Sequence, residues 1–211
     1  MKDIPIFTTE HGAAGLVLRE IPYRGNAYVR LHASQEPLEL ARECARFCRG
    51  CGAERVYGTG HPALADLPLH TQILRLSRLR EGIGETDAAL WPVLPENVEQ
   101  WRQFYNQRMA DVANAAYMTA SDGAAMLRAG DGYFVHRGEE LLGIGRASGQ
   151  TLSVVAALRP GAGRDVVLAL CHALTEQSVW LETARSNAAA MRLYEKLGFS
   201  PVSLGESWYC L

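Results

Sequence analysis

One stretch, LETARSNAAAMRLYEKLGF from Leu181 to Phe199, constrains the fold of this chain more than any other. Residues 179–183, which overlap the start of this stretch, are apolar and β-branched enough to predict a buried strand. Ser186 and Asn187 are residue types that cap helices, and strong helix formers follow them up to Gly198. A glycine at that place commonly ends a helix in the left-handed conformation. The stretch therefore predicts a strand that leads directly into a capped helix.

The predicted helix has one apolar face that includes a single phenol. Ala190, Leu193, Tyr194 and Leu197 recur at the spacing i, i+3, i+4 and i+7. Side chains at this spacing share one face of a helix, and an apolar face packs against the rest of the fold. We therefore expect Tyr194 to face the sheet to which the preceding strand belongs.

The same stretch resembles the C-terminal motif of the GNAT acetyltransferases, and most closely that of ribosomal-protein N-terminal alanine acetyltransferases. The agreement covers Leu181-Glu182, Ser186-Asn187, Ala190, Leu193-Tyr194-Glu195 and Leu197-Gly198-Phe199. The resemblance implies that acetyl-CoA is the donor and that Asn187 and Tyr194 contact it. It also implies that Tyr194 protonates the departing thiolate, and that Glu182 deprotonates the attacking amine, directly or through water. The alternative is a structural role, with Tyr194 a core phenol and Glu182 a strand-edge residue.

The chemistry of acetyl transfer gives independent reasons for these two residue types. An ammonium group must lose a proton before its nitrogen can attack a thioester, and a nearby carboxylate can accept that proton. A thiolate leaving group needs a proton donor instead, and a phenol with a pKa of about 10 still holds its proton at neutral pH. Glu182 and Tyr194 therefore form a candidate base and acid.

A second segment has the pattern of an anion-binding turn. Residues 151–157 predict a strand, Gly161 and Gly163 lie in the turn, and residues 166–174 predict an apolar helix. The free amides and the dipole at a helix start favour an anion, and glycine lets it approach closely. By resemblance this turn is the pyrophosphate loop for coenzyme A. The expected contacts are Val155, Ala156, Ala157, Gly161, Ala162, Gly163, Arg164 and Asp165, together with Asn187 and Tyr194.

The loop departs from the family pattern at two positions. Aligned on its glycines, the chain has Pro160 where an arginine is expected and Asp165 where a small residue is expected. We expect a carboxylate at the helix start to satisfy the free amides and to repel phosphate, with Arg159 and Arg164 offsetting part of the repulsion. The alternative is a GNAT fold that has lost or altered its coenzyme site.

The C-terminal part of the chain, residues 87–211, has the element order of one GNAT domain. It begins with a strand at residues 90–93 and a helix that opens at Pro95, and later contains a hairpin across residues 137–139. In the family, the first two helices and their connection line the acceptor pocket. By resemblance, the candidate acceptor-binding residues are Tyr105, Asn106, Arg108, Asn114 and Tyr117.

Residues 1–86 predict an N-terminal α+β subdomain with the order β-β-α-β-β, which a degenerate second GNAT-like half would explain. Residues 81–86, with two glycines, are the expected linker. The predicted fold class is mixed α/β: the GNAT N-acyltransferase fold, with a mixed, mostly antiparallel sheet flanked by helices.

Cys44, Cys48 and Cys51 have the C-x3-C-x2-C spacing that some iron–sulfur enzymes use. However, residues 36–49 have helical periodicity, which places Cys44 and Cys48 one turn apart on an apolar face. A cysteine in such a place behaves as a small hydrophobe. We therefore expect no bound metal, although the iron–sulfur alternative stays open.

The net charge of −2 and the lack of a basic cluster argue against nucleic acid as a partner. No apolar run approaches a membrane span, and the first residues lack the apolar core of a signal peptide. Five cysteines, an odd number, indicate the cytoplasm rather than a disulfide framework. Taken with the resemblance to the GNAT acetyltransferases, which implies the activity, these features lead us to expect a cytoplasmic N-acetyltransferase that acts on a small-molecule amine or a peptide N-terminus. The alternative is a non-catalytic acyl-CoA sensor or interaction module, and homodimer formation is left open.

Overall fold

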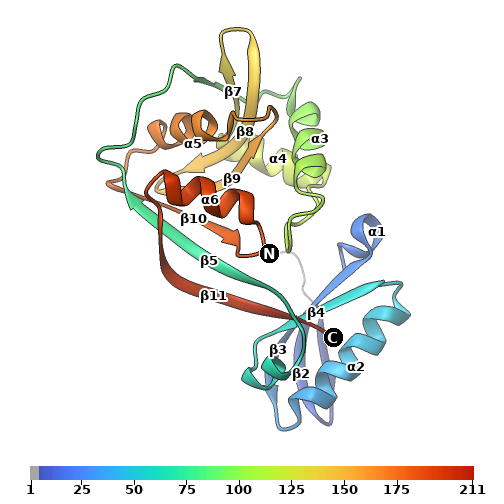
Figure 1. Ribbon diagram of the computed structural model, residues 1–211. Helices are drawn as coiled ribbons and strands as arrows, with labels where there is room; N and C mark the ends of the chain where they lie inside the picture. The colour runs from blue at the N-terminus through green and yellow to red at the C-terminus, as the bar shows by residue number, and fades with distance from the viewer. Residues whose placement is uncertain (1–4) are drawn as a thin grey trace. The chain divides into compact units, whose positions relative to one another are not determined.

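The computed structural model describes residues 5–211 (Figure 1). The chain divides into two compact units. Unit 1 comprises the residues up to Ile73 together with Gly205–Leu211, and unit 2 comprises Leu74–Leu204. The long strands β5 (Leu69–Leu79) and β11 (Ser200–Cys210) contribute residues to both units. The domain division expected from the sequence, between residues 86 and 87, lies in the segment between β5 and β6.

Unit 1 contains a sheet with the strand order β1-β2-β3-β4-β11. Its elements are β1 (Ile6–Thr9), β2 (Gly12–Val17), α1 (Ile21–Arg24), β3 (Asn26–Ser34), α2 (Pro37–Gly50), β4 (Arg55–Thr59) and the 3-10 helix η1 (Pro62–Asp66). The order β-β-α-β-β predicted for residues 1–86 includes α2 but neither of the short helices α1 and η1. Both short helices begin at or next to a proline, whose fixed φ favours a first helical turn.

Helix α2 packs with one face on the sheet of unit 1. Cys44 and Cys48 lie on that face and are fully buried in the core cluster, among residues of β2, β3 and β4. Burial raises the pKa of Cys44 to about 12 and that of Cys48 to about 11. Cys51 follows the helix end and is exposed, and all three thiols are free. These cysteines therefore lie in the predicted helix and its C-terminal turn.

Unit 2 has the strand order β5-β10-β9-β8-β7-β6. Its further elements are β6 (Ala89–Pro92), α3 (Val98–Arg108), α4 (Ala120–Ala129), β7 (Gly132–Arg137), β8 (Glu140–Ser148), β9 (Thr151–Ala157), α5 (Gly163–His172), β10 (Ser178–Ala184) and α6 (Ala188–Lys196). Strands β6 to β9 are antiparallel neighbours, and β10 runs parallel to β9. The mixed, mostly antiparallel sheet that the sequence predicts is therefore present.

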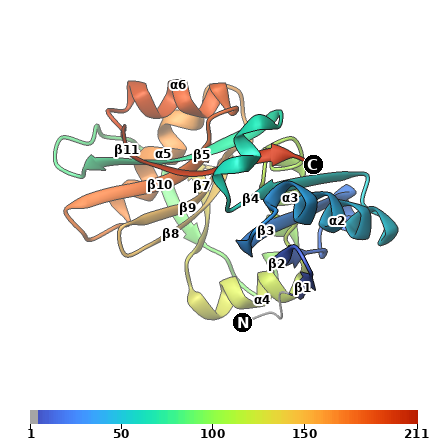
Figure 2. The same ribbon diagram turned by 90° about the horizontal axis from the view of Figure 1, so that it is seen from below.

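Helices cover both faces of the sheet of unit 2. Helices α5 and α6 pack with Val135, Leu152 and Leu181 in one core cluster, whereas α3 and α4 pack with Phe134 and Ile144 in another. Adjacent residues of a strand point to opposite faces, so the two clusters lie on opposite sides of the sheet. Figures 1 and 2 show α6 on one side of these strands and α4 on the other.

The strand, cap and helix predicted at the C-terminal motif are confirmed as β10 and α6. The Asn187 side chain caps α6, because its Oδ1 accepts the Ala190 N–H at 3.2 Å. Gly198 follows the helix with a φ of +81°. The predicted hairpin is also confirmed, as β7 and β8. Local residue types determine each of these features.

Two helix starts differ from the prediction. Helix α3 begins at Val98 rather than at Pro95, because the Asn97 Oδ1 accepts the Leu94 N–H at 2.8 Å and forms a turn before the helix. Helix α5 begins at Gly163 rather than at residue 166, so that Asp165 lies inside its first turn. None of the helices between residues 5 and 211 is long and apolar enough to span a membrane.

Candidate functional site

The parallel strands β9 and β10 separate soon after they meet. Their register comprises the pairs Thr151–Trp180 and Leu152–Leu181 within the described residues. Strand β9 nevertheless continues to Ala157 and stays paired with β8, and β10 continues to Ala184. The edges of the two strands beyond Leu152 and Leu181 are therefore not bonded to one another, and their backbone groups can bond another molecule.

The separated part of β9 contains three residues that the resemblance assigned to coenzyme binding. Val155 and Ala157 pack against the core on the α5 and α6 side. Ala156 is buried in the core on the α3 and α4 side. This segment therefore contributes side chains to both faces of the sheet. Its unpaired backbone edge faces the gap, by which we mean the space between β9 and β10 beyond Leu152 and Leu181.

The start of α5 lies directly after β9 and has the features of an anion site. Gly161 has a φ of +82°, and a Cβ built there would meet no other atom within 4 Å, so the turn is open on that side. No side chain caps the helix at Ala162, and the first backbone bond runs from the Val166 N–H to the Ala162 carbonyl at 3.0 Å. Three amides precede that bond and lie at the positive end of the dipole, namely those of Gly163, Arg164 and Asp165.

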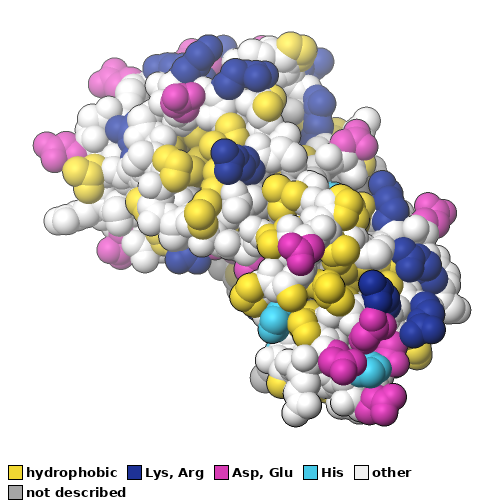
Figure 3. Space-filling model, turned by 60° about the horizontal axis from the view of Figure 1, so that its bottom comes forward, with side chains coloured by type: hydrophobic (Ala, Val, Ile, Leu, Met, Phe, Trp, Pro, Cys, Tyr) yellow, Lys and Arg dark blue, Asp and Glu magenta, His cyan; other side chains and the backbone are white. Residues whose placement is uncertain are grey.

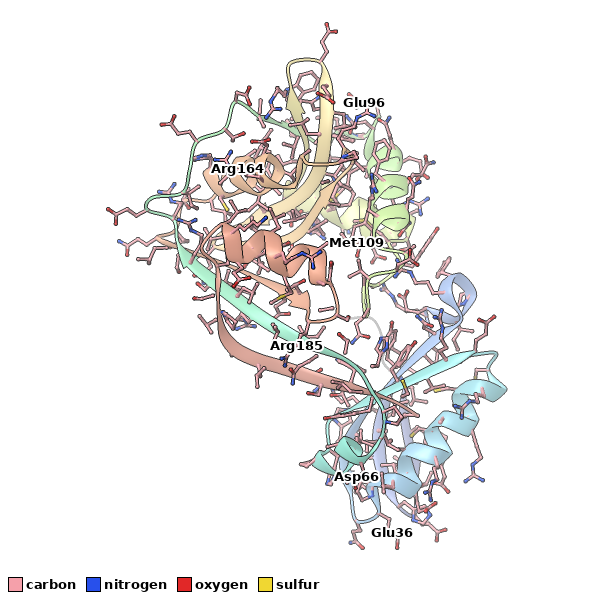
Figure 4. All side chains as sticks on the ribbon, viewed as in Figure 1. Glu36, Asp66, Glu96, Met109, Arg164 and Arg185 are labelled. Carbon is pink, nitrogen blue, oxygen red and sulfur yellow. The ribbon has the colours of Figure 1, made fainter. Side chains whose placement is uncertain are left out.

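Asp165 does not cap α5, and this corrects the expectation from the sequence. Its Oδ2 accepts a hydrogen bond from the Arg137 Nη2 at 2.8 Å, and its Oδ1 accepts one from the Thr86 Oγ1 at 3.1 Å. The Arg164 Nη1 lies 3.4 Å from the same Oδ1. Figure 4 labels Arg164 at the start of α5. The carboxylate is therefore bonded to side chains, and the helix amides are not occupied by it.

Tyr194 lies on α6 and is 6% exposed. Its ring contacts that of Phe199 edge to face, with 5.7 Å between the centroids. Burial raises the pKa of the Tyr194 phenol, and the neighbouring Cys171 thiol adds to this effect. Tyr194 therefore holds its proton at neutral pH and belongs to the core on the α5 and α6 side.

Glu182 points to the opposite face of the sheet. Val179 and Leu181 are buried in the core on the α5 and α6 side, so the alternation of β10 directs Glu182 toward the face that carries α3 and α4. The Glu182 Oε1 accepts hydrogen bonds from the Arg75 Nη2 at 2.8 Å and Nε at 3.2 Å. The Arg75 guanidinium lies 4.5 Å from the centroid of the Trp180 ring. The predicted base and acid thus lie on different faces of the sheet, and Glu182 lies in the part of β10 that has left β9.

Three of the predicted acceptor residues bond to the backbone of unit 2. The Tyr105 hydroxyl donates to the Ala116 carbonyl at 3.1 Å, and the Arg108 Nη2 donates to the Leu158 carbonyl at 2.7 Å. The Asn106 amide bonds both the N–H and the carbonyl of Met118, at 2.8 and 3.0 Å. These bonds fix the segment between α3 and α4 and tie the end of α3 to the end of β9.

Asn114 differs from the other members of this group. It has a φ of +61°, a conformation that asparagine tolerates better than most residues. Its Oδ1 and Nδ2 are both buried and make no hydrogen bond to any described residue. A buried amide without partners is costly, so the two atoms can be satisfied by a bound molecule. Tyr117, the fifth candidate, is partly buried and bonds through its side chain with Arg102.

A cavity of about 550 Å³ lies in unit 1 beside α2, and none of the predicted site residues lines it. It is lined by Leu38, Glu39, Ala41, Arg42, Ala45, Arg46, Arg49, Leu67 and Leu211. Figure 3 shows acidic, basic and hydrophobic side chains mixed on the visible face of the molecule. Among the described residues, no group of three or more His, Cys, Asp or Glu is arranged to hold a metal ion.

Comparison with known proteins gives one family and several structures of the same fold. The model of the acetyltransferase (GNAT) family matches residues 94–199. A functionally unknown conserved protein from Staphylococcus epidermidis is 10% identical, with a TM-score of 0.60 over 100% of this chain and 94% of its own. A GCN5-related N-acetyltransferase from Sphaerobacter thermophilus is 14% identical, with a TM-score of 0.60 over 94% and 76%.

A tandem GNAT protein from the clavulanic acid biosynthesis pathway is 11% identical, with a TM-score of 0.51 over 95% of this chain and 78% of its own. None of the curated proteins matches the sequence. At these identities, the structures show that the fold is shared.

Proposed function

The chain belongs to the acetyltransferase (GNAT) family, and from this premise we propose that it transfers an acetyl group from acetyl-CoA directly to an amine. The observation that carries the proposal is the separation of β9 from β10 next to the start of α5. An extended ligand can bond the free strand edge at one end and the helix amides at the other. Coenzyme A has amides and a diphosphate in this order along its length.

The residues around the gap fit the coenzyme. Gly161 leaves space next to the helix amides, and Asp165 is bonded elsewhere. Asn187 uses its Oδ1 to cap α6, which leaves its Nδ2 to contact the ligand as the resemblance implies. We place the diphosphate at Gly161–Arg164 and the pantetheine amides along Val155–Ala157. The bound thioester supplies an activated acetyl group.

The acid and the base reach the reaction from the two faces of the sheet. The Glu182 carboxylate takes a proton from the acceptor ammonium, and the nitrogen then attacks the thioester carbonyl. As the new C–N bond forms, the C–S bond breaks and the sulfur receives a proton from the Tyr194 hydroxyl. The Tyr194 hydroxyl carries its proton at neutral pH, although burial raises its pKa and makes it a weaker acid than a solvated phenol. Among residues 5–211, Arg75 bonds the Oε1 of Glu182, and we assign the Oε2 to the acceptor.

The acceptor side of the site is formed by the segment between α3 and α4. In this proposal Asn114 is the residue that bonds the acceptor, because its amide oxygen and nitrogen are buried without partners in the described chain. Tyr105, Asn106 and Arg108 hold the segment in place, and Tyr117 lies at its end. The acceptor class is an amine, either a small molecule or a peptide N-terminus. We also propose a cytoplasmic location, which the free cysteines support.

The experiment that tests the proposal measures release of free CoA thiol from acetyl-CoA with a panel of amines. The panel contains amino acids, polyamines, aminoglycosides and peptides with N-terminal alanine, the last because the motif at residues 181–199 resembles the alanine acetyltransferases. We expect at least one amine to raise thiol release above the rate of hydrolysis. Failure of every class, with coenzyme binding intact by calorimetry, would refute the transferase activity.

Coenzyme binding without acetylation of any amine would instead support a non-catalytic acyl-CoA sensor. Two observations favour it as the alternative: Tyr194 is almost fully buried, and Glu182 is held in an ion pair with Arg75. A sensor needs the gap and the helix start, but it needs neither a mobile proton on Tyr194 nor a free carboxylate on Glu182.

A further inference from the structure

Two helices of unit 2 have an aspartate at the third position of the first turn, and the two carboxylates behave differently. In α4, the Asp122 Oδ2 accepts the N–H of the capping residue Thr119 at 3.0 Å, as the last member of a capping box. In α5, Asp165 holds the same position after Ala162, but no side chain caps that helix. The sequence position alone therefore does not determine where such a carboxylate bonds.

The difference lies in the partners that surround Asp165. Arg137, at the end of β7, bonds the Asp165 Oδ2 at 2.8 Å and the Asp87 Oδ1 at 2.8 Å. Thr86 donates its hydroxyl to the Asp165 Oδ1 and accepts the Ala88 N–H at 3.2 Å, which fixes the hydroxyl in this orientation. The Asp165 side chain is only 17% exposed, so these bonds are partly shielded from water.

From this geometry we propose that Arg137 and Thr86 are positioning residues for coenzyme binding, which hold the Asp165 carboxylate away from the helix amides. Without them, the carboxylate can turn toward the first turn of α5, next to the free amides of Gly163 and Arg164, and repel or displace an anionic ligand there; the Ala162 amide itself donates to the Arg159 carbonyl at 3.3 Å. The inference rests on the proposed function, because the ligand it concerns is the CoA diphosphate. It also explains how a loop with an acidic residue at this place can accept that diphosphate.

The test is a cycle of calorimetric Kd values for CoA with wild type, Arg137→Gln, Asp165→Asn and the double variant. We expect Arg137→Gln to weaken binding roughly 5- to 30-fold, the upper part of the range for a charge at a helix N-terminus, because Asp165 is partly shielded from water. In the Asp165→Asn background the same change should weaken binding no more than about 3-fold, because the competing charge is gone. Thr86→Val should act in the same direction as Arg137→Gln, with a smaller effect.

Two controls separate positioning from stability and from direct contact. Arg146→Gln breaks a similar pair with Asp131, 2.7 Å apart, elsewhere in unit 2 and should leave the Kd for CoA unchanged. Binding of pantetheine, which lacks the diphosphate, should be equal in wild type and Arg137→Gln.

Equal losses on both Asp165 backgrounds would overturn the inference and identify Arg137 as a direct phosphate ligand. An unchanged Kd in Arg137→Gln would overturn it as well. Wild-type protein that binds no CoA at all would overturn the proposed function together with this inference, and is thereby distinguishable from the other two results.

Discussion

The chain contains the same connection twice, a pair of parallel strands joined by one helix. The strands stay paired in unit 1, whereas those of unit 2 separate after two residue pairs. In unit 1, β3 and β4 are paired from Asn26–Arg55 to Arg30–Thr59. In unit 2, β9 and β10 share a register only at Thr151–Trp180 and Leu152–Leu181. The first pair bonds its facing edges to one another, whereas the second leaves them for other partners.

The starts of the two connecting helices, α2 and α5, also differ in how many groups they leave available to a ligand. Helix α2 begins with Pro37, which has no N–H, and Glu39 places a carboxylate in the first turn. Helix α5 begins after the open turn at Gly161, and its acidic residue is bonded elsewhere. A backbone hydrogen bond left unmade in a buried place costs about 1–3 kcal/mol. The two connections share one topology, and only the one in unit 2 combines unpaired strand edges with the uncapped helix start to which we assign the proposed coenzyme site.

The largest expected effect comes from Tyr194, the buried tyrosine on α6, which follows β10 in unit 2. Tyr194→Phe removes one hydroxyl and keeps the ring, so it should lower kcat roughly 10²- to 10⁴-fold with little change in the Kd for CoA. Tyr57→Phe, on β4 of unit 1 and also buried at 7% exposure, is the matched control and should leave kcat unchanged. Both are measured on the amine identified in the panel. Equal turnover in wild type and Tyr194→Phe would leave that phenol a packing residue.

A somewhat smaller effect is expected from the carboxylate on β10. Glu182→Gln should lower kcat about 10²-fold and weaken the pH dependence of the rate, because the proposed proton acceptor is removed. Glu206→Gln in unit 1 is the matched control, since Glu206 is also a partly exposed carboxylate paired with an arginine, Arg30. If the two variants have the same rate and the same pH profile, the base is another group.

Features determined by neighbouring residues were predictable from the sequence. Asn187 caps a helix three residues from its partner Ala190, and Gly198 ends the same helix, so β10 and α6 follow from one short stretch. The predicted fold class is likewise confirmed by the family match and the solved structures. In such stretches propensity, capping and periodicity agree.

Features determined by distant residues were not predictable in this way. Asp165 is bonded to Arg137, 28 residues away, and to Thr86, 79 residues away, so no local pattern shows that its carboxylate leaves the helix. The ion pair between Arg75 and Glu182 spans 107 residues. Strand β11, which contains Pro201 and Gly205, has weak strand propensity, and its place beside β4 depends on long-range pairing. The roles of the candidate site residues stay predictions.

The next effect is a loss of stability from replacing three cysteines of unit 1, with no change in coenzyme binding. Serine at Cys44, Cys48 and Cys51 places two hydroxyls in the core and should lower the free energy of unfolding by about 1–3 kcal/mol for each buried site. Cys51→Ser alone, at the exposed position, should change it little. Denaturant melts give the stability, and calorimetry should give an unchanged Kd for CoA. Loss of CoA binding in folded protein, or stoichiometric metal in the wild type by elemental analysis, would contradict this.

The smallest expected effect is a pH dependence that belongs to unit 2. The His136 ring stacks on Trp91 with 4.1 Å between centroids, and its Nδ1 is buried without a partner among the described residues. Desolvation lowers the pKa of His136 in the folded state, so below about pH 6.5 the unfolded chain binds the proton more readily. The free energy of unfolding should therefore fall as the pH decreases from 7 to 5.5, by no more than about 1 kcal/mol from this residue.

His136→Asn removes the titrating ring, so denaturant melts of this variant at the two pH values should differ by less than those of the wild type. The pH dependence of His136 appears in the melt only if β7, the strand that contains it, unfolds in the measured transition. The size of the difference therefore also indicates whether unit 2 unfolds cooperatively. An identical pH dependence in the two proteins would show that His136 titrates alike in the folded and unfolded chain. The Trp91 stack would then provide packing without desolvating the ring.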